Sequence, residues 1–365
     1  MVKVILAGGG TGGHIYPAVA IASEFKSRYP DSEILFVGTK KGLEKEIVSK
    51  HQFRLEFISA KGFVRGLKKE ILLLPFFLMR SIIETWMIMR NFKPDIVVGT
   101  GGYVSLPVVL MAGIMGKKTL IQEQNSFPGL STRILSLVAG RVCLSYENSA
   151  NFFLVRKKLK ILGNPVRKGI ISGEKNKGIK ELNLHPDKKT LFILGGSQGS
   201  KKINASVKEA VNYFEQYEDI QLLWQTGEKD FENIKNFMKD KKITSSVFPF
   251  IQDMASAYAV SDLLVCRAGA LTLSEIAACG KPSILIPYPF ATGDHQRYNA
   301  LFLKEKGAAE LLLESELMGE NLAERAVDLL MNENKLKQMS ENIKTLAKPL
   351  ATSQIVNEME ELLER

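Results

Sequence analysis

The stretch GGGTGGH, residues 8–14, is the first in the chain whose residue types could do chemistry. It follows an apolar run directly and contains five glycines and a histidine. Glycines between a strand and a helix let backbone N–H groups approach a phosphate, and the helix N-terminus adds partial positive charge. A tight turn by itself would explain only one or two glycines. The stretch therefore predicts a site for a phosphorylated ligand.

Gly8, Gly10 and Gly13 also satisfy the dinucleotide-binding fingerprint. That fingerprint needs an acidic residue at the end of the second strand to hold a ribose, but the chain has Gly38, Thr39 and two lysines there. NAD is therefore disfavoured as the ligand.

His14 closes this loop ahead of a helix that we expect from Pro17. The helix dipole and desolvation both disfavour a charged imidazolium there, so a neutral ring could accept a proton as a general base. The alternative is a histidine that caps the helix or packs in the core. Its place in the glycine-rich loop favours the catalytic role.

A second glycine-rich loop, GGSQGS, follows the apolar run TLFIL. Gly195, Gly196 and Gly199 would form a nest for phosphate oxygens, with Ser197 as a hydroxyl donor. Further along, Glu275 falls on a predicted helix where its carboxylate could accept both hydroxyls of a ribose, although exposed helical glutamates are common. The other binding groups that we expect are the N–H groups of Ala270 to Thr272, the guanidinium groups of Arg167 and Arg267, and the amides of Gln296 and Asn299.

No D-x-D motif or histidine–carboxylate cluster stands at a strand end to hold Mg²⁺ or Mn²⁺ against a diphosphate. We therefore expect no metal cofactor. Arginines and helix N-termini would instead meet the phosphate charge.

The elements that must position these groups follow from length and pattern. A chain of 365 residues is long enough for two domains. Short apolar runs alternate with helical patterns on both sides of a mixed, basic segment at 157–189, which predicts two parallel, doubly wound α/β sheets. Ile355, Met359 and Leu362 predict an amphipathic C-terminal helix, whose packing partner the periodicity does not identify.

Charge and cysteine content narrow the class of protein further. The net charge of +10 predicts an anionic partner, and nucleic acid is the weakest candidate because no zinc-finger, KH or RRM motif occurs. Cys143, Cys266 and Cys279 lack CxxC spacing and lie in or beside apolar runs, so we expect buried, reduced thiols. No signal peptide is visible, which favours a cytoplasmic location.

Residues 66–93 form the most apolar segment. Pro75, Arg80 and Glu84 interrupt it, so it does not fit a transmembrane helix. A buried core helix would account for half of its apolar positions, but apolar residues occur around most of its circumference. We therefore expect an interfacial surface for anionic membrane. The basic residues that flank it are Lys61, Arg65, Lys68, Lys69, Arg80 and Arg90.

Seven motifs together resemble the MurG family of bacterial UDP-N-acetylglucosamine transferases. GGGTGGHIYPAVA, GTGGYVS, EQNSFPG, GNPVR, GGSQGS, CRAGALTLSEIAA and DHQ with NA occur in that family's order and spacing over the whole chain. The resemblance implies a GT-B glycosyltransferase fold, with two Rossmann-like parallel-sheet domains facing a cleft. It also implies the inverting transfer of GlcNAc from UDP-GlcNAc to the MurNAc 4-hydroxyl of lipid I, which forms lipid II for peptidoglycan synthesis and cell division.

The resemblance assigns residues 1–162 and a C-terminal helix, 345–365, to an acceptor- and membrane-binding domain, and residues 163–344 to a UDP-GlcNAc-binding domain. It implies a peripheral protein at the cytoplasmic face of the cell membrane, in contact with lipid I, anionic inner-leaflet lipid and cell-wall synthesis proteins. His14 is the implied base, with Glu123 as the alternative. The implied substrate-binding residues are Thr11, Gly12, Gly13, Tyr103, Asn125, Arg167, Ser197, Ile251, Ala270, Leu271, Thr272, Leu273, Ser274, Glu275 and Gln296.

Other functions of the same fold stay open at this point. One is a related enzyme, such as a diacylglycerol glycosyltransferase or a UDP-GlcNAc 2-epimerase, and another is a non-catalytic subunit that binds nucleotide sugar. The acceptor residues His14, Tyr103 and Asn125 argue against a protein that only binds.

Overall fold

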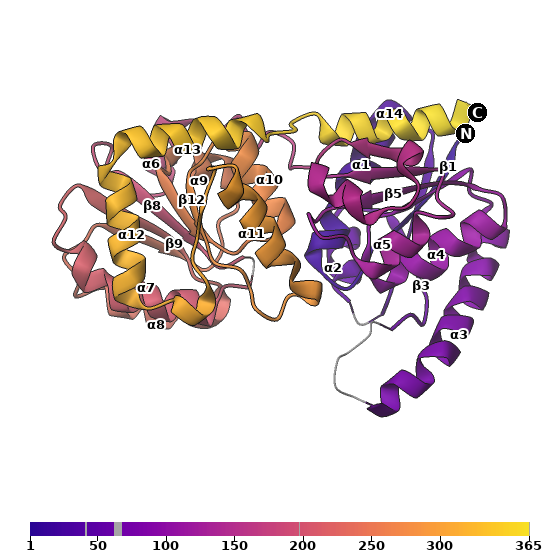
Figure 1. Ribbon diagram of the computed structural model, residues 1–365, viewed down its shortest axis with the longest axis horizontal. Coiled ribbons are helices and arrows are strands. Elements are labelled where there is room, and N and C mark those ends of the chain that lie inside the picture. The colour runs from indigo at the N-terminus through magenta and orange to yellow at the C-terminus, as the bar shows by residue number, and fades with distance from the viewer. Residues whose placement is uncertain (41, 62–67, 197, 365) are drawn as a thin grey trace. The chain divides into compact units, whose positions relative to one another are not determined.

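The computed structural model describes residues 1–40, 42–61, 68–196 and 198–364 and contains two compact units (Figure 1). Unit 1 comprises Met1–Val166 and Lys348–Arg365, and unit 2 comprises Arg167–Ala347. The chain thus passes between the units after residues 166 and 347, where the resemblance implied boundaries after residues 162 and 344.

Unit 1 is built around one parallel sheet. Its strands are β1 (Lys3–Ala7), β2 (Glu33–Gly38), β3 (Arg54–Phe57), β4 (Ile96–Gly99), β5 (Lys118–Glu123), β6 (Arg141–Leu144) and β7 (Leu159–Ile161). Its helices are α1 (Gly12–Arg28), α2 (Glu44–Lys50), α3 (Lys68–Phe92), α4 (Gly102–Ile114), α5 (Leu130–Leu135) and α14 (Ala351–Glu364), with short 3₁₀ helices at Glu147–Phe152 and Arg156–Lys158. The seven strands run in the order β3-β2-β1-β4-β5-β6-β7.

Helices cover both faces of this sheet because alternate strand residues point to opposite sides. Val4 and Leu6 of β1 pack in a core with α1 and α14. Ile5 and Ala7 of the same strand pack in a second core with α3, α4 and α5. β1 is therefore buried on both faces, as parallel α/β sheets require.

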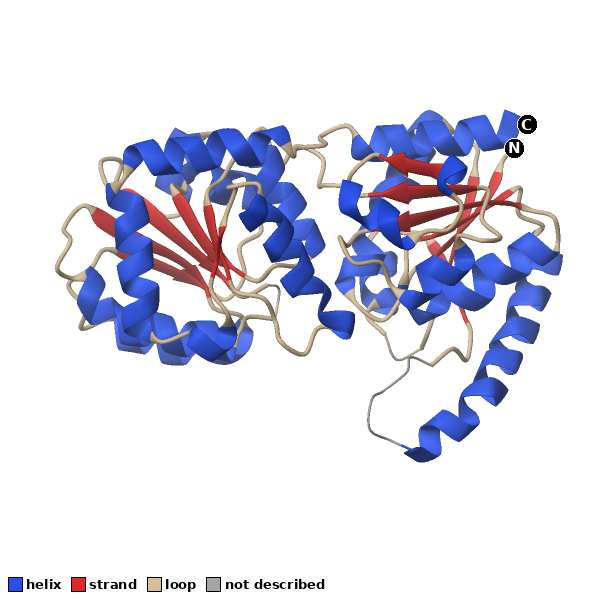
Figure 2. Ribbon diagram, viewed as in Figure 1, coloured by secondary structure: helices blue, strands red, loops and turns tan. Residues whose placement is uncertain are grey.

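Unit 2 repeats this architecture (Figure 2). Its strands are β8 (Lys189–Leu194), β9 (Ile220–Gln225), β10 (Ser245–Phe248), β11 (Leu263–Cys266), β12 (Ser283–Leu285) and β13 (Glu310–Leu311). Its helices are α6 (Lys175–Glu181), α7 (Lys201–Phe214), α8 (Glu228–Met238), α9 (Met254–Val260), α10 (Ala270–Cys279), α11 (His295–Glu305), α12 (Gly319–Met331) and α13 (Glu333–Thr345), with 3₁₀ helices at Thr292–Asp294 and Glu314–Glu316. The six parallel strands run in the order β10-β9-β8-β11-β12-β13.

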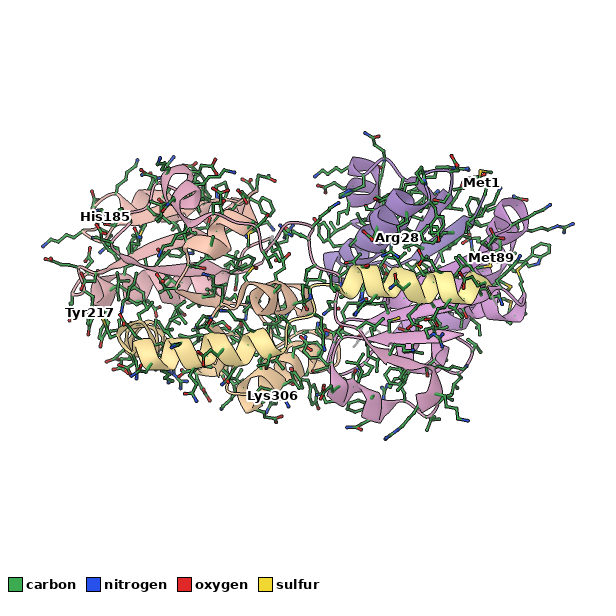
Figure 3. The ribbon with its side chains drawn as sticks, turned by 90° about the horizontal axis from the view of Figure 1, so that it is seen from above. Met1, Arg28, Met89, His185, Tyr217 and Lys306 are labelled. Carbon is green, nitrogen blue, oxygen red and sulfur yellow. The ribbon has the colours of Figure 1, made fainter. Side chains whose placement is uncertain are left out.

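The C-terminal helix α14 packs on unit 1, the partner that periodicity did not identify. Its apolar side, with Ile355 and Met359, is buried in the core that contains α1. At the end of α1, Arg28 donates to Asn357 Oδ1 at 2.6 Å and to Glu360 Oε1 at 3.1 Å, and it lies beside α14 in Figure 3. On β6, the Arg141 side chain pairs with Glu358 at 2.5 Å, and both side chains are only 9% exposed. Apolar burial and two arginines thus hold the last helix to the first unit.

Candidate active site

The loops after β1 and β4 lie at the centre of the unit 1 sheet. These two strands pair with each other, and β2 and β5 extend the sheet away from them on opposite sides. Such a reversal of strand order is the point where open α/β sheets bind ligands. Both α1 and α4 begin there, after the N-cap residues Thr11 and Gly101, and neither N-cap provides a side-chain hydrogen bond. The first turns of two helices therefore offer unsatisfied N–H donors to an anion.

The two loops approach each other so closely that side chains would not fit. A Cβ atom on Gly102, whose φ is +75°, would lie 2.3 Å from the carbonyl oxygen of Gly9. A Cβ atom on Gly101, whose φ is +99°, would lie 2.7 Å from Nδ1 of His14. These glycines are needed for backbone conformation and for space, which explains their density in both motifs.

His14 lies within the first turn of α1, which begins at Gly12. Our expectation of a helix from Pro17 was therefore wrong at its start, because the first-turn N–H groups need no intrahelical partner and glycines can adopt the turn. The imidazole Nδ1 is 3.1 Å from the carbonyl oxygen of Thr100 and 2.9 Å from Oε1 of Gln124. Since a carbonyl oxygen only accepts, Nδ1 carries the hydrogen in the neutral ring. Nε2 then carries the lone pair, and no described residue bonds to it.

Glu123, the alternative base, is already occupied. Its side chain is 3% exposed, and its Oε1 accepts from the backbone and side-chain nitrogens of Asn125 at 3.0 and 3.2 Å. Its Oε2 accepts from the N–H of Gly129 at 3.1 Å. The carboxylate therefore holds the loop after β5, and the geometry favours His14 as the base. Asn125, which is also buried, is fixed by this clamp.

The remaining predicted acceptor residues lie around the same loops. Thr11 and Gly13 are exposed and Gly12 is half-buried at the start of α1. The Tyr103 hydroxyl is 3.5 Å from Oγ1 of Thr39, and the ring edge borders Gly10. The structure thus brings all six predicted acceptor residues to the carboxyl edge of β1, β4 and β5.

Sequence reasoning missed a buried carboxylate at this edge. Glu44, at the start of α2, is 1% exposed, and its Oε1 accepts from the Gly10 N–H at 3.2 Å and from the Thr39 N–H at 3.3 Å. The acidic residue absent from the end of β2 is therefore supplied six residues later, where it braces the first glycine-rich loop. No motif in the sequence singled out Glu44 for this role.

Unit 2 places its own loops at an equivalent switch point. β8 and β11 pair at the centre of the sheet, and the segment Gly195–Gly199 follows β8. A Cβ atom on Gly199, whose φ is +75°, would lie 2.1 Å from the carbonyl oxygen of Thr226. Ser200 caps α7 by accepting from the Ile203 N–H at 3.4 Å. Ser197, the predicted hydroxyl donor, lies outside the described residues.

Two predicted donor-site residues contact each other in unit 2. Arg167 Nε is 2.8 Å from Glu275 Oε1, and the buried Tyr258 hydroxyl donates to Glu275 Oε2 at 3.0 Å. Burial raises the pKa of Glu275, and the Arg167 guanidinium and the Tyr258 hydroxyl oppose that shift. Burial also raises the pKa of the Tyr258 phenol well above its ordinary value, so it remains a hydrogen-bond donor. Glu275 is thus a buried carboxylate on α10 with an arginine at its exposed side.

The first turn of α10 supplies backbone donors beside this pair. Gly269, its N-cap, has no side chain, and N–H groups in the first turn of a helix lack intrahelical partners, so those of Leu271 and Thr272 could donate to a ligand. The N–H of Leu273 already bonds to the Gly269 carbonyl at 3.0 Å, and the Ser274 hydroxyl bonds to the Ala270 carbonyl at 3.0 Å. Of the predicted segment 270–275, the N–H groups of Leu271 and Thr272 and the Glu275 carboxylate therefore stay the predicted ligand groups.

Arg267 and Asn299 have hydrogen-bond or ion-pair partners within unit 2. The Arg267 guanidinium pairs with Glu314 at 2.5 Å, donates to Ser200 Oγ at 2.8 Å, and donates to two backbone carbonyls. Asn299 is fully buried and donates to the Ala268 carbonyl at 3.3 Å. These contacts hold the loop after β11, and the ligand contacts expected of Arg267 and Asn299 stay a prediction.

Gln296 lies nearer the surface of unit 2 than Ile251 does. Gln296 is half-buried, and its Oε1 accepts from the Tyr288 N–H at 2.9 Å. Ile251 is 3% exposed, and its N–H donates to Gln225 Oε1 at 2.9 Å. Any contact between Ile251 and a ligand would therefore use its backbone carbonyl.

The three thiols are buried or half-buried. Burial raises the pKa of Cys266 to about 12 and that of Cys279 to about 11, and it raises that of Cys143 further. Within the described part of the chain, no three histidine, cysteine, aspartate or glutamate side chains form a group that could hold a metal ion.

The outer side of α3 carries an apolar face, which we define as Phe76, Met79, Ile83 and Met87. These side chains are 46 to 64% exposed, whereas Ser81, Thr85 and Met89 on the opposite side are 1% exposed. The N-terminal end of α3 projects from unit 1 in Figure 1. The alternative considered for residues 66–93, a buried core helix, is therefore wrong for this face of α3. In the described residues, no helix combines the length and hydrophobicity that crossing a membrane requires.

The basic residues near this face are only partly described. Lys61 lies 4.1 Å from the centroid of the Phe77 ring, and Arg90 lies 5.3 Å from that of Trp86. Arg80 pairs with Glu84 at 2.9 Å. Arg65 and the side chains of Lys68 and Lys69 lie outside the described part of the structure.

Two doubly wound parallel sheets, each with glycine-rich loops and helix N-termini at its switch point, form the GT-B fold, and the family matches make the chain a glycosyltransferase. Residues 4–144 match the glycosyltransferase family 28 N-terminal domain, and residues 190–355 match the family 28 C-terminal domain. The chain belongs to the MurG family within glycosyltransferase family 28.

Individual relatives agree with this membership. The chain is 42% identical over 364 residues to a Thermodesulfovibrio yellowstonii protein named UDP-N-acetylglucosamine--N-acetylmuramyl-(pentapeptide) pyrophosphoryl-undecaprenol N-acetylglucosamine transferase, covering 100% of this chain and 99% of the relative. It is 41% identical to a Desulforamulus reducens protein of the same name, with the same coverage. The crystal structure of Acinetobacter baumannii MurG superposes with a TM-score of 0.83 at 31% identity, covering 99% of this chain and 100% of that one. A UDP-GlcNAc 2-epimerase from Neisseria meningitidis, at 13% identity and a TM-score of 0.69, shares the fold.

Proposed function

We propose that this chain transfers GlcNAc from UDP-GlcNAc to the 4-hydroxyl of the MurNAc residue of lipid I, releasing UDP and forming lipid II. Its full-length relatives carry the name of that activity. The observation in this chain that carries the proposal is His14, whose Nε2 is a proton acceptor beside two helix N-termini.

The acceptor would bind unit 1. The N–H groups at the starts of α1 and α4 would donate to the pyrophosphate oxygens of lipid I, and Asn125 and Tyr103 would orient its sugar. The 4-hydroxyl would then donate its proton to Nε2 of His14 as its oxygen attacks the anomeric carbon of GlcNAc. The new glycosidic bond forms on the face opposite the departing UDP, so the configuration at that carbon inverts.

The donor would bind unit 2. The starts of α7 and α10 would hold the diphosphate, and Arg167 would add a positive charge beside it. Glu275 uses one acceptor position on each oxygen for Arg167 and Tyr258, so the remaining lone pairs can accept the ribose hydroxyls. Peptide-group dipoles and an arginine would thus stabilise the leaving diphosphate without a metal ion.

The apolar face of α3 would hold the enzyme at the cytoplasmic face of the membrane, where its lipid acceptor resides. Four exposed apolar side chains at helical spacing, with Arg80 and Arg90 on the same helix, fit the acyl and anionic headgroup layers of a bilayer surface. We propose anionic inner-leaflet lipid and proteins of cell-wall synthesis as its other partners.

A transfer assay with radiolabelled UDP-GlcNAc tests this function. Purified protein should label lipid I in detergent micelles and leave diacylglycerol unlabelled. Label on diacylglycerol would indicate a different glycosyltransferase. Conversion of UDP-GlcNAc to its 2-epimer without any acceptor would indicate an epimerase, and binding of UDP-GlcNAc with neither product would indicate a non-catalytic subunit.

A further inference from the structure

The imidazole of His14 is held by uncharged groups. Its Nδ1 has two acceptors, the Thr100 carbonyl at 3.1 Å and Gln124 Oε1 at 2.9 Å. Tyr16, Glu44, Tyr103 and Glu123 are titratable residues at this end of the surrounding elements, and the described hydrogen bonds and ion pairs link none of them to the imidazole. A side-chain amide therefore occupies the place where a carboxylate supports the histidine of many hydrolases.

The amide of Gln124 can take only one orientation. Its Nε2 donates to the Thr100 carbonyl at 2.7 Å, to the Gln122 carbonyl at 3.2 Å and to Oε1 of Gln122. A flipped amide would turn its oxygen toward these three acceptors, which would leave them without a donor. Gln124 Oε1 must therefore face His14.

Buried neighbours fix Gln122 in turn. Its Nε2 donates to Asn164 Oδ1 at 2.9 Å and to Ser145 Oγ at 3.2 Å. Asn164 Nδ2 returns to the Gln124 carbonyl at 3.0 Å, and Gln122, Gln124 and Asn164 are each 2% exposed or less. These three buried amides hydrogen-bond to one another, so each limits the orientation of the next.

We propose that Gln124 is a positioning residue, which orients the His14 ring, fixes its hydrogen on Nδ1 and strengthens Nε2 as a proton acceptor. The inference rests on the proposed role of His14 as the base. When Nε2 takes the acceptor proton, Nδ1–H becomes part of a cation and donates more strongly, so Gln124 Oε1 stabilises the protonated ring more than the neutral one.

The matched variants are Gln124→Met and Gln122→Met. Both replace a buried amide of equal length by an apolar side chain, but only Gln124 contacts His14. We expect Gln124→Met to lower kcat about 10- to 100-fold, by analogy with the loss of a group that orients a metal-binding histidine. Its acidic limb in the profile of kcat/KM against pH should move about one unit lower, because the imidazolium has lost an acceptor. Gln122→Met should keep the wild-type limb, since two backbone carbonyls still orient Gln124. Equal limb positions in the two variants would overturn the proposal.

Nitrogen-15 NMR of the histidines gives a readout that does not depend on transfer. The chain has only four histidines, so His14→Gln identifies the signal of His14. Wild-type protein should show hydrogen on Nδ1 in the neutral ring, and the midpoint of its titration should fall in Gln124→Met. Hydrogen on Nε2, or an unchanged midpoint, would overturn the inference.

Two further controls separate the possible failures. If Gln124→Met does not fold, Gln124→Asn keeps a polar amide in the buried network but withdraws its oxygen from Nδ1 by one methylene, and the same shift is expected. If wild-type protein transfers no GlcNAc, the proposed function fails. If His14→Ala retains its kcat, the role of His14 as the base fails. In both cases the NMR titration still decides how Gln124 acts on the ring.

Discussion

Replacing Glu275 by glutamine should weaken UDP-GlcNAc binding. It should also remove the fall in donor affinity that we expect for wild-type protein at acidic pH. In wild-type protein both carboxylate oxygens already have one partner, Arg167 at 2.8 Å and Tyr258 at 3.0 Å. A glutamine would keep one acceptor oxygen, but its NH₂ group would face either the Arg167 guanidinium or the Tyr258 hydroxyl, and the negative charge would be lost. A hydrogen bond to a charged group contributes about 1.5 to 3 kcal/mol, so Kd should rise roughly 10- to 150-fold.

The pH dependence follows from the environment of the carboxylate. Burial raises the pKa of Glu275 above its ordinary value, despite the opposing effect of Arg167. As pH falls through that raised pKa, the carboxylate gains a proton and loses its charge, so donor affinity should fall. The affinity for UDP-GlcNAc should be highest above the raised pKa. It should begin to decline at a higher pH than if the carboxylate were exposed. The glutamine variant has nothing to titrate there, so its Kd should stay flat over the same range.

Isothermal titration calorimetry with UDP-GlcNAc from pH 7 downward measures both effects. Tyr258→Phe is the matched control, because it keeps the buried ring and removes only the hydroxyl that donates to Glu275. Its affinity should begin to decline at a still higher pH, since that hydroxyl favours the charged carboxylate. Wild-type affinity in the glutamine variant at every pH would refute the assignment of Glu275 to the donor site.

The other predictions concern the base, the metal, the membrane and the last helix. His14→Ala should lower kcat by about 10² to 10⁴ with little change in KM for UDP-GlcNAc, and a loss confined to donor affinity in steady-state kinetics would make His14 a structural residue. Turnover should survive excess EDTA, and activity that is lost and then restored by Mg²⁺ or Mn²⁺ would contradict the proposed stabilisation of the diphosphate. Changing Phe76 and Met79 to glutamate should reduce sedimentation with anionic vesicles at an unchanged circular dichroism spectrum, because both side chains are more than 60% exposed; undiminished sedimentation would remove α3 from the membrane surface. Glu358→Ala leaves the buried Arg141 without its closest partner and should lower the free energy of unfolding by about 3 to 5 kcal/mol, with urea denaturation as the measurement and an unchanged midpoint as the contrary result.

The sequence by itself determined the architecture and the position of the candidate site. Alternating apolar runs and helical patterns are local signals, and they predicted two parallel sheets because a buried strand and an amphipathic helix each have a characteristic period. The glycine-rich loop after the first strand placed His14 in the candidate site, a predicted helix placed Glu275, and the family resemblance added Glu123. The motifs also carried the family resemblance, which the full-length relatives confirm.

Only the tertiary structure decided what each polar side chain contacts. Arg267 pairs with Glu314 and Asn299 donates to the Ala268 carbonyl, and these partners lie 47 and 31 residues away along the chain. Glu44 and Gln124 gave no motif signal, yet one braces the glycine-rich loop and the other bonds to His14 across 110 residues of chain. Hydrogen bonds act over about 3 Å, so they depend on which segments the fold brings together, and spacing along the chain does not contain that information.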